Sequence, residues 1–79
     1  MWFVYVIYSK SYDRVYIGMS ESPEKRLLGH NSGETKSTKG FRPWVLIYKE
    51  SIGSRENARK REKYLKSGIG REFIKNLKK

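Results

Sequence analysis

The chain begins with an unbroken run of aromatic and β-branched residues, Trp-Phe-Val-Tyr-Val-Ile-Tyr at positions 2–8. Such a run is typical of a strand that is covered on both faces. Positions 11–14 (Ser-Tyr-Asp-Arg) have turn chemistry, and residues 15–18 (Val-Tyr-Ile-Gly) read as a returning strand. The chain is therefore predicted to open with a β-hairpin, so pairing within its sheet should be mostly antiparallel.

A helix is predicted directly after this hairpin. Ser22 is suited to the N-cap, and Pro23 to the first helical position. Leu27 and Leu28 mark the side that we expect to be buried. The sequence Asn-Ser-Gly at 31–33 ends the helix.

The second half of the chain alternates loop, strand and helix. Residues 33–42 are polar and lack apolar periodicity, which predicts a loop, whereas 44–48 (Trp-Val-Leu-Ile-Tyr) predict another covered strand. A helix is predicted from 54 to about 67, ended by Gly68 in the left-handed conformation. A short helix completes the chain, which gives the order β-β-α-β-α-α and the α+β class.

The length and composition of the chain limit its architecture. A chain of 79 residues forms one small domain, here predicted to span 1–79, with a thin core. It has no cysteine and one histidine, so a disulfide or a zinc site built from thiolates is excluded. No stretch approaches the ~20 apolar residues of a membrane helix. The opening segment lacks the features of a signal peptide, so a cytoplasmic location is expected.

The chain is strongly basic. It has 18 Lys and Arg against 8 Asp and Glu, a formal net charge of +10, which favours a phosphate-backbone partner. Acidic membrane surfaces are a weaker alternative because they usually need an amphipathic helix with a broad apolar face. A merely solvated basic surface is the other alternative. The residues predicted to contact nucleic acid are Lys25, Lys36, Lys39, Arg42, Arg59 and Lys63.

Two tyrosines of the hairpin are candidates for chemistry. If the turn holds an even number of residues, odd positions of the first strand pair with even positions of the second. Tyr5 and Tyr16 then lie on the same face of the sheet, whereas a three-residue loop would separate them. Tyrosines in strands are also common packing residues. Gly18 marks a point where the backbone turns sharply or approaches another group closely.

Arg26 and His30 are four residues apart, so they share one face of the predicted first helix. An arginine fork can hold a phosphate oxygen in two-point contact. A histidine can donate a hydrogen bond or transfer a proton near neutral pH. The alternative is an ordinary solvated helix surface.

Glu62 interrupts an apolar stripe on the predicted 54–67 helix. Ala58, Leu65 and Ile69 follow the spacing of one helix face, and Glu62 falls within it. An inward-facing carboxylate needs a cationic partner or a metal ion. A salt bridge to an arginine and a ligand for Mg²⁺ are both compatible with this position.

Taken in order, these residues resemble the GIY-YIG nuclease family, in its small single-domain bacterial branch. The second half of the signature is present as Tyr16-Ile17-Gly18, and the first half is reduced to Phe3-Val4-Tyr5. The family's helix arginine, following histidine and glutamate fall on Arg26, His30 and Glu62. The resemblance covers about residues 2–77.

The resemblance implies a three-stranded antiparallel sheet with the first strand central and flanked by helices. It also implies endonucleolytic hydrolysis of DNA, with RNA as the alternative substrate, using one Mg²⁺ or Mn²⁺ held by Glu62. Tyr5 or Tyr16 would act as general base, with a pKa lowered by the metal and nearby cations. Arg26 would stabilise charge on the phosphoryl group and His30 would orient or relay the proton.

The chain departs from the family pattern in two places. Met19 and Ser20 follow Gly18, where the family often has a lysine, and only Asn76 is a candidate for the asparagine of larger members. Larger relatives also carry a separate DNA-binding domain for targeting, which these 79 residues do not provide, so weak or structure-selective cleavage is expected instead of site-specific cutting. The alternatives are a non-catalytic nucleic-acid binder that keeps the nuclease scaffold, and a small basic scaffold protein of a larger assembly.

Overall fold

The computed structural model describes residues 1–78, and Lys79, the predicted end of the domain and of its last helix, lies outside the described residues. The predicted order and the α+β class are confirmed, with one addition, a four-residue helix inside the predicted loop. The elements are β1 (Trp2–Ser9), β2 (Arg14–Ser20), α1 (Pro23–Ser32), α2 (Lys36–Lys39), β3 (Val45–Ile52), α3 (Arg55–Leu65) and α4 (Gly68–Leu77).

The three strands form one antiparallel sheet in the order β2-β1-β3, so β1 is central, as the resemblance implied. Tyr5 pairs with Gly18 and Ile7 pairs with Tyr16. The connection between the paired residues Ser9 and Arg14 is residues 10–13, an even number. Odd positions of β1 therefore pair with even positions of β2, so of the two alternatives left open by the sequence, the one in which both tyrosines share a face holds.

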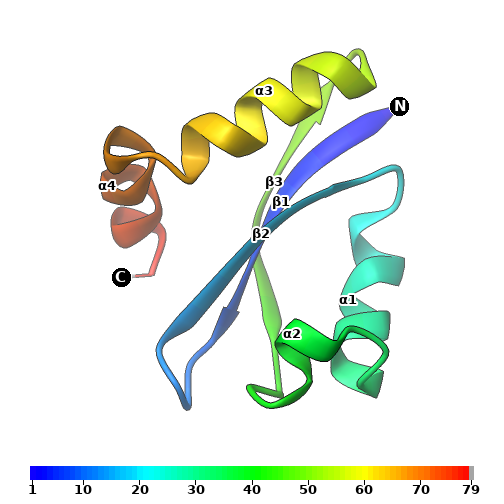
Figure 1. Cartoon of the computed structure of the whole chain (residues 1–79), viewed down its shortest axis with the longest axis vertical. Coiled ribbons are helices and arrows are strands. Elements are labelled where there is room, and N and C mark those ends of the chain that lie inside the picture. Colours follow the sequence, from blue (N-terminus) through cyan, green and yellow to red (C-terminus); the bar gives the residue numbers. More distant parts are fainter. Residues whose placement is uncertain (79) are drawn as a thin grey trace.

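One face of the sheet carries an aliphatic core beneath α3 and α4 (Figure 1). Val4 and Val6 of β1 point to this side and are fully buried. They pack with Ala58 and Leu65 of α3 and Ile74 of α4. Burial of a Val, Leu or Ile side chain contributes roughly 1.5–3 kcal/mol, so this layer contributes strongly to the stability of the fold.

The opposite face carries an aromatic core on the side of α1 and α2 (Figure 1). Tyr5 and Ile7 of β1 are buried there together with Trp44, which precedes β3. Tyr16 of β2 and Leu27 of α1 pack against this cluster from its margin. Alternation along β1 thus places different chemistry on the two sides of one strand.

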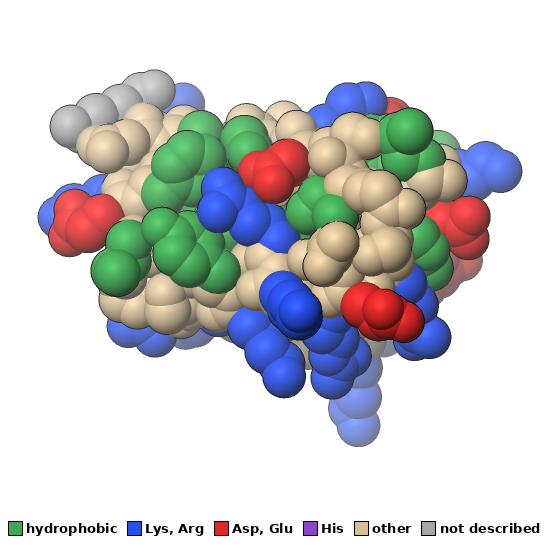
Figure 2. Space-filling view, turned by 90° about the horizontal axis from the view of Figure 1, so that it is seen from above, with side chains coloured by type: hydrophobic (Ala, Val, Ile, Leu, Met, Phe, Trp, Pro, Cys, Tyr) green, Lys and Arg blue, Asp and Glu red, His purple; other side chains and the backbone are tan. Residues whose placement is uncertain are grey.

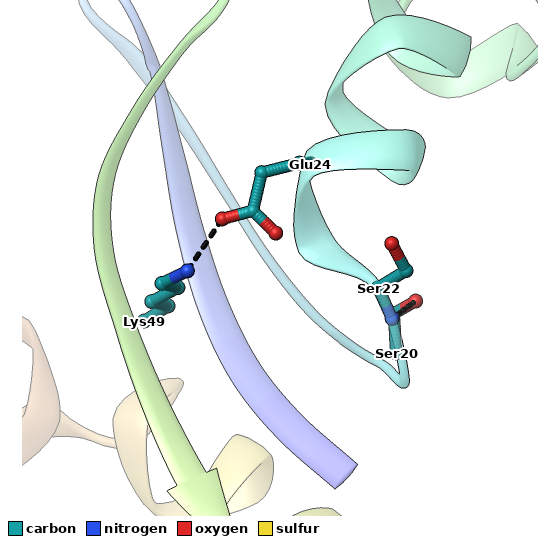
Figure 3. A network of polar contacts seen from close by, with 4 residues as sticks. All are labelled: Ser20, Ser22, Glu24 and Lys49. Carbon is teal, nitrogen blue, oxygen red and sulfur yellow. Dashed lines mark hydrogen bonds and ion pairs between the residues drawn. The ribbon is translucent and has the colours of Figure 1, made fainter. Parts of the chain in front are cut away.

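Helix α1 is fixed at both ends, although not by the bond that the sequence suggested. Ser22 occupies the N-cap position, but its hydroxyl makes no capping bond; instead its N–H donates to the Ser20 hydroxyl at 2.9 Å. Glu24 in the first turn pairs with Lys49 of β3 (Figure 3). The Lys49 ammonium lowers the pKa of that carboxyl. Gly33 ends the helix in the left-handed conformation, with φ 85°.

The predicted role of Gly68 as a left-handed helix end is wrong. Helix α3 ends at Leu65 with an ordinary right-handed cap at Lys66, and Gly68 is the first residue of α4. The Ser67 hydroxyl accepts a hydrogen bond from the Gly70 N–H, so a new helix begins at once. A side chain at Gly70 would collide with the backbone of α3, so the two helices cross closely there.

Two predicted core positions are also wrong, because both side chains are 71% exposed. Leu28 points about 100° away from Leu27 around α1, and here Leu27 packs against the aromatic core while Leu28 is turned to solvent. Ile69 lies on α4 and so does not continue the stripe of α3. Among residues 1–78, no helix has the length and apolar character needed to cross a bilayer.

Candidate active site

A polar pocket of about 280 Å³ lies where β1 begins and β2 ends. Because β2 is an edge strand and Gly18 has no side chain, groups from both sides of the sheet reach this pocket. Tyr5, Tyr16 and Arg26 line it from the α1 side. Its remaining lining residues are Trp2, Gly18, Met19, Arg55, Arg59 and Glu62.

Gly18 is required because Tyr5 lies directly over it. A Cβ atom at Gly18 would be 2.6 Å from the Tyr5 hydroxyl, closer than nonbonded atoms approach. The cross-strand pair Tyr5–Gly18 therefore lets the phenol lie across β2 toward the pocket. The sequence prediction of a close approach at Gly18 is confirmed.

His30 is fully buried and connects two hydroxyl groups. Its Nε2 lies 3.1 Å from the Tyr5 hydroxyl, and its Nδ1 lies 2.8 Å from the hydroxyl of Thr38. Thr38 donates its one hydroxyl proton to the Thr35 carbonyl at 3.2 Å, so it accepts from His30 Nδ1–H. This assigns a lone pair to Nε2, which accepts the Tyr5 O–H.

The surroundings of the hydrogen-bonded residues Tyr5 and His30 shift their pKa values. Burial raises the pKa of the Tyr5 phenol above its ordinary value of 10.0, although the neighbouring Arg26 guanidinium opposes the rise. Burial, assisted by the positive charge of Arg26, lowers the pKa of His30 below its ordinary 6.5. The protein's own groups therefore do not give Tyr5 the lowered pKa that the resemblance implied. His30 is neutral at pH 7 and able to accept a proton.

Tyr16 supports this arrangement from β2. Its ring centroid lies 4.7 Å from that of His30 and 6.4 Å from that of Tyr5. The three rings form a continuous packed group between the sheet and α1. Arg26, one turn before His30 on α1, is exposed at the pocket.

Glu62 lines the same pocket from α3, with its side chain 17% exposed. Its Oε2 accepts from Lys66 Nζ at 3.2 Å, so the carboxylate forms a salt bridge, but with a lysine of the next helical turn and not with the arginine that the sequence suggested. Its Oε1 makes no hydrogen bond to the residues that the structure describes. The charges meeting in the pocket are thus one carboxylate and three guanidinium groups, those of Arg26, Arg55 and Arg59.

The sequence and the fold agree with one family. The model of the GIY-YIG catalytic domain matches residues 1–74. The chain belongs to the GIY-YIG family. This is a nuclease family whose members generally depend on divalent metals, which implies an endonuclease-type function.

Small bacterial proteins resemble this GIY-YIG chain over most of its length. A UPF0213 protein of Staphylococcus haemolyticus is 33% identical over 95% of this chain and 92% of its own. One of Staphylococcus saprophyticus is 35% identical over 82% of this chain and 79% of its own. The solution NMR structure of a UPF0213 protein from Bacillus halodurans has 29% identity and a TM-score of 0.56. It covers 99% of this chain and 86% of that one.

The basic residues of this GIY-YIG domain are divided between two sides of the sheet. Of the six predicted to contact nucleic acid, Lys25 on α1, Lys36 and Lys39 on α2 and the following Arg42 lie on the aromatic side, whereas Arg59 and Lys63 lie on α3 (Figure 1). Figure 2, which views the α3 side, shows Lys and Arg side chains projecting together along one long edge. Of the six residues predicted to contact nucleic acid, Arg59 lines the pocket and Lys25, Lys36, Lys39, Arg42 and Lys63 are exposed elsewhere.

Two site residues were missed by sequence reasoning. Thr38 lies in a stretch without periodicity, and a four-residue helix is too short to give a pattern. Trp2 reaches the pocket only because β1 and α3 begin near the same end of the sheet. Asn76 is exposed in the last turns of α4 and does not line the pocket.

Proposed function

We propose that this chain is a metal-dependent endonuclease that hydrolyses phosphodiester bonds in DNA. The observation that carries the proposal is the pocket itself. Tyr5, Arg26 and Glu62 come from three different elements and line one space of about 280 Å³. Tyr5 supplies a hydroxyl that is hydrogen-bonded to the proton acceptor His30. Arg26 supplies a cation for phosphate, and Glu62 supplies a carboxylate for a metal ion.

Tyr5 is the proposed general base, acting through His30. The Tyr5 oxygen takes a proton from the attacking water while its own proton moves along the 3.1 Å hydrogen bond to His30 Nε2. As the water oxygen bonds to phosphorus, the P–O bond to the leaving sugar oxygen breaks, and that oxygen takes a proton from solvent. The buried imidazole becomes a cation, and its Nδ1–H remains hydrogen-bonded to Thr38. Because the phenol never has to carry a full negative charge, its raised pKa is compatible with this role.

Arg26 is proposed to bind the scissile phosphate. It lies at the pocket one helical turn from His30, and Arg55 and Arg59 add positive charge on the α3 side. A guanidinium placed beside a phosphate stabilises the charge that builds up on its oxygens in the transition state. Tyr16 packs against His30 and keeps the imidazole aligned with Tyr5.

Glu62 is the proposed ligand of one Mg²⁺ or Mn²⁺. Among residues 1–78 no three acidic or histidine side chains gather in a metal-binding cluster. A single carboxylate with a free oxygen still fits an ion that takes one or two carboxylates and retains several waters. When bound, such an ion supplies Lewis-acid stabilisation of the phosphate oxygens. Because three arginines share the pocket with Glu62, we expect the dication to bind together with the phosphate instead of alone.

The test is nicking of supercoiled plasmid and cutting of a branched DNA in Mg²⁺ or Mn²⁺. The unmodified protein should cut and lose this activity when the metal is chelated, and Glu62→Ala and Arg26→Ala should abolish cutting. DNA binding is measured in parallel for all three proteins. No cutting by the unmodified protein, with binding that survives both substitutions, would identify a non-catalytic binder. The same assay with an RNA of equal sequence decides the preferred nucleic acid.

A further inference from the structure

A larger groove, of about 580 Å³, lies on the other side of β2, away from the catalytic pocket. Its floor is aliphatic: the half-buried Val15 and Ile17 of β2 form its accessible part, and the buried Leu65 of α3 and Ile74 of α4 lie beneath them. Alternation along β2 separates the two sites, because Tyr16 and Gly18 face the catalytic pocket while Val15 and Ile17 face the groove. The mechanism uses none of these aliphatic side chains.

The rim of the groove is entirely basic, with Lys66, Arg71, Lys75 and Lys78. Lys66 and Lys78 are already paired, with Glu62 and Asp13 respectively. Arg71 and Lys75 are exposed on α4 and form no ion pair with the described residues. The groove therefore presents uncompensated positive charge directly beside an apolar floor.

We propose that this groove is a docking site for an acidic segment of a partner protein, whose aliphatic side chains fill the floor while its carboxylates meet the rim. The floor of the groove matches the aliphatic side chains of this segment, and its rim matches the carboxylates. The apolar floor gains free energy only from apolar side chains. The basic rim selects anionic neighbours and disfavours cationic ones.

The chemistry of the groove favours a protein over nucleic acid or lipid. Phosphates need only the cations, and no aromatic side chain lines the groove to stack on a base. A membrane surface is bound by a broad exposed apolar helix face, whereas this apolar surface is recessed between β2, α3 and α4. Acidic peptides with an apolar stripe match both the recess and its rim.

The test uses synthetic peptides and the complete chain, followed by methyl NMR and calorimetry. The acidic peptide carries a leucine stripe flanked by glutamates; one control replaces the glutamates with lysine and another replaces the leucines with serine. The acidic peptide should bind and shift the methyl signals of Val15, Ile17, Leu65 and Ile74. Both control peptides should bind at least about tenfold more weakly.

Variants of the protein locate the binding. The double substitution Arg71→Glu and Lys75→Glu changes two exposed residues, and it should weaken binding of the acidic peptide at least about tenfold. Lys60→Glu is the matched control, because Lys60 is exposed on α3 outside the groove, and its effect should stay within about twofold. Circular dichroism checks that each variant is folded.

Several results would overturn this docking site. They are failure of the acidic peptide to bind, equal binding of the lysine or serine peptide, and binding that the double substitution leaves unchanged. Shifts of the groove methyls by a short DNA duplex or by laurate, but not by the peptide, would also overturn it. Repeating the titration with Arg26→Ala separates this proposal from the nuclease proposal, since Arg26 lines the catalytic pocket and not the groove, and docking requires no activity.

Discussion

The two faces of β1 are equally buried but are built from different chemistry. Val4 and Val6 pack into an aliphatic layer under α3 and α4, whereas Tyr5, on the other face, begins a hydrogen-bonded chain through His30 to Thr38. An aliphatic residue would fill the space of Tyr5 without needing partners. A buried polar chain whose members are all hydrogen-bonded, ending at a charged pocket, is what a functional site requires. The comparison predicts that substitutions on one face change activity and substitutions on the other change stability.

The largest effect should come from Tyr5→Phe, which removes the hydroxyl and keeps the ring. We expect the single-turnover rate of DNA cleavage to fall by about 10²–10⁴-fold, the usual contribution of a general base. Leaving His30 Nε2 without its donor should also lower the free energy of unfolding by about 1–3 kcal/mol. Tyr16→Phe is the matched control and should retain most of the rate. Equal rates for Tyr5→Phe and the unmodified protein would remove the base assignment.

On the aliphatic face, Leu65→Ala should cost stability instead of activity. Deleting a fully buried leucine side chain should lower the free energy of unfolding by about 2–5 kcal/mol, measured by urea denaturation. The cleavage rate per folded molecule should be unchanged. If the variant does not fold, the milder Ile74→Val, expected to cost about 0.5–1.5 kcal/mol, serves the same purpose. A rate loss like that of Tyr5→Phe would show that the two faces are not separate.

A smaller effect is expected where the two strands touch. Gly18→Ala places a methyl group 2.6 Å from the Tyr5 hydroxyl, so the phenol must move. We expect a loss of about 1–3 kcal/mol in stability together with slower cleavage. Gly53→Ala is the control, since nothing lies within 4 Å of its added carbon and the substitution should stabilise by about 0.4–1 kcal/mol. Effects of the same sign at both glycines would contradict the close-approach explanation.

The smallest effect concerns pH. His30 has a lowered pKa in the folded state, so below the ordinary value of 6.5 the unfolded chain binds a proton that the folded chain does not. Stability should therefore fall as the pH is lowered from 7 to about 5.5, a window in which Tyr5 and Arg26 do not titrate. Thermal melts of the unmodified protein and of His30→Gln measure the difference in slope. An equal slope in both proteins would mean that His30 does not cause the decline.

Much of the fold could be predicted because its signals are local. Residues 2–8 predict the central strand, and Pro23 places the start of α1. The shared face of Tyr5 and Tyr16 is not among these local signals, because it requires knowing that the connection between the strands holds an even number of residues. The other two depend on only a few neighbouring residues, which the sequence displays directly.

The errors occur where contacts between distant segments decide. Gly68 looks like a helix end, but the Ser67 cap and the close crossing of α3 and α4 turn it into a helix start. Ile69 therefore leaves the stripe of α3. Thr38 contacts His30 only because α2 folds back onto α1. No hydrophobic periodicity in the sequence predicts this contact. Glu62 and Tyr5 line the same pocket because β2 is an edge strand. Which strand lies at the edge is a property of the complete sheet.

The central claim is that α1 and α3, on opposite faces of the sheet, complete one site across the edge of β2. The most direct measurement is a titration with Mn²⁺ in the presence of a short DNA duplex, followed by paramagnetic broadening of backbone amide signals. The account predicts that Gly18 of β2 and Glu62 of α3 broaden first and together, and that Glu62→Ala abolishes the effect at Gly18. Broadening confined to other acidic residues, or unchanged in Glu62→Ala, would contradict it.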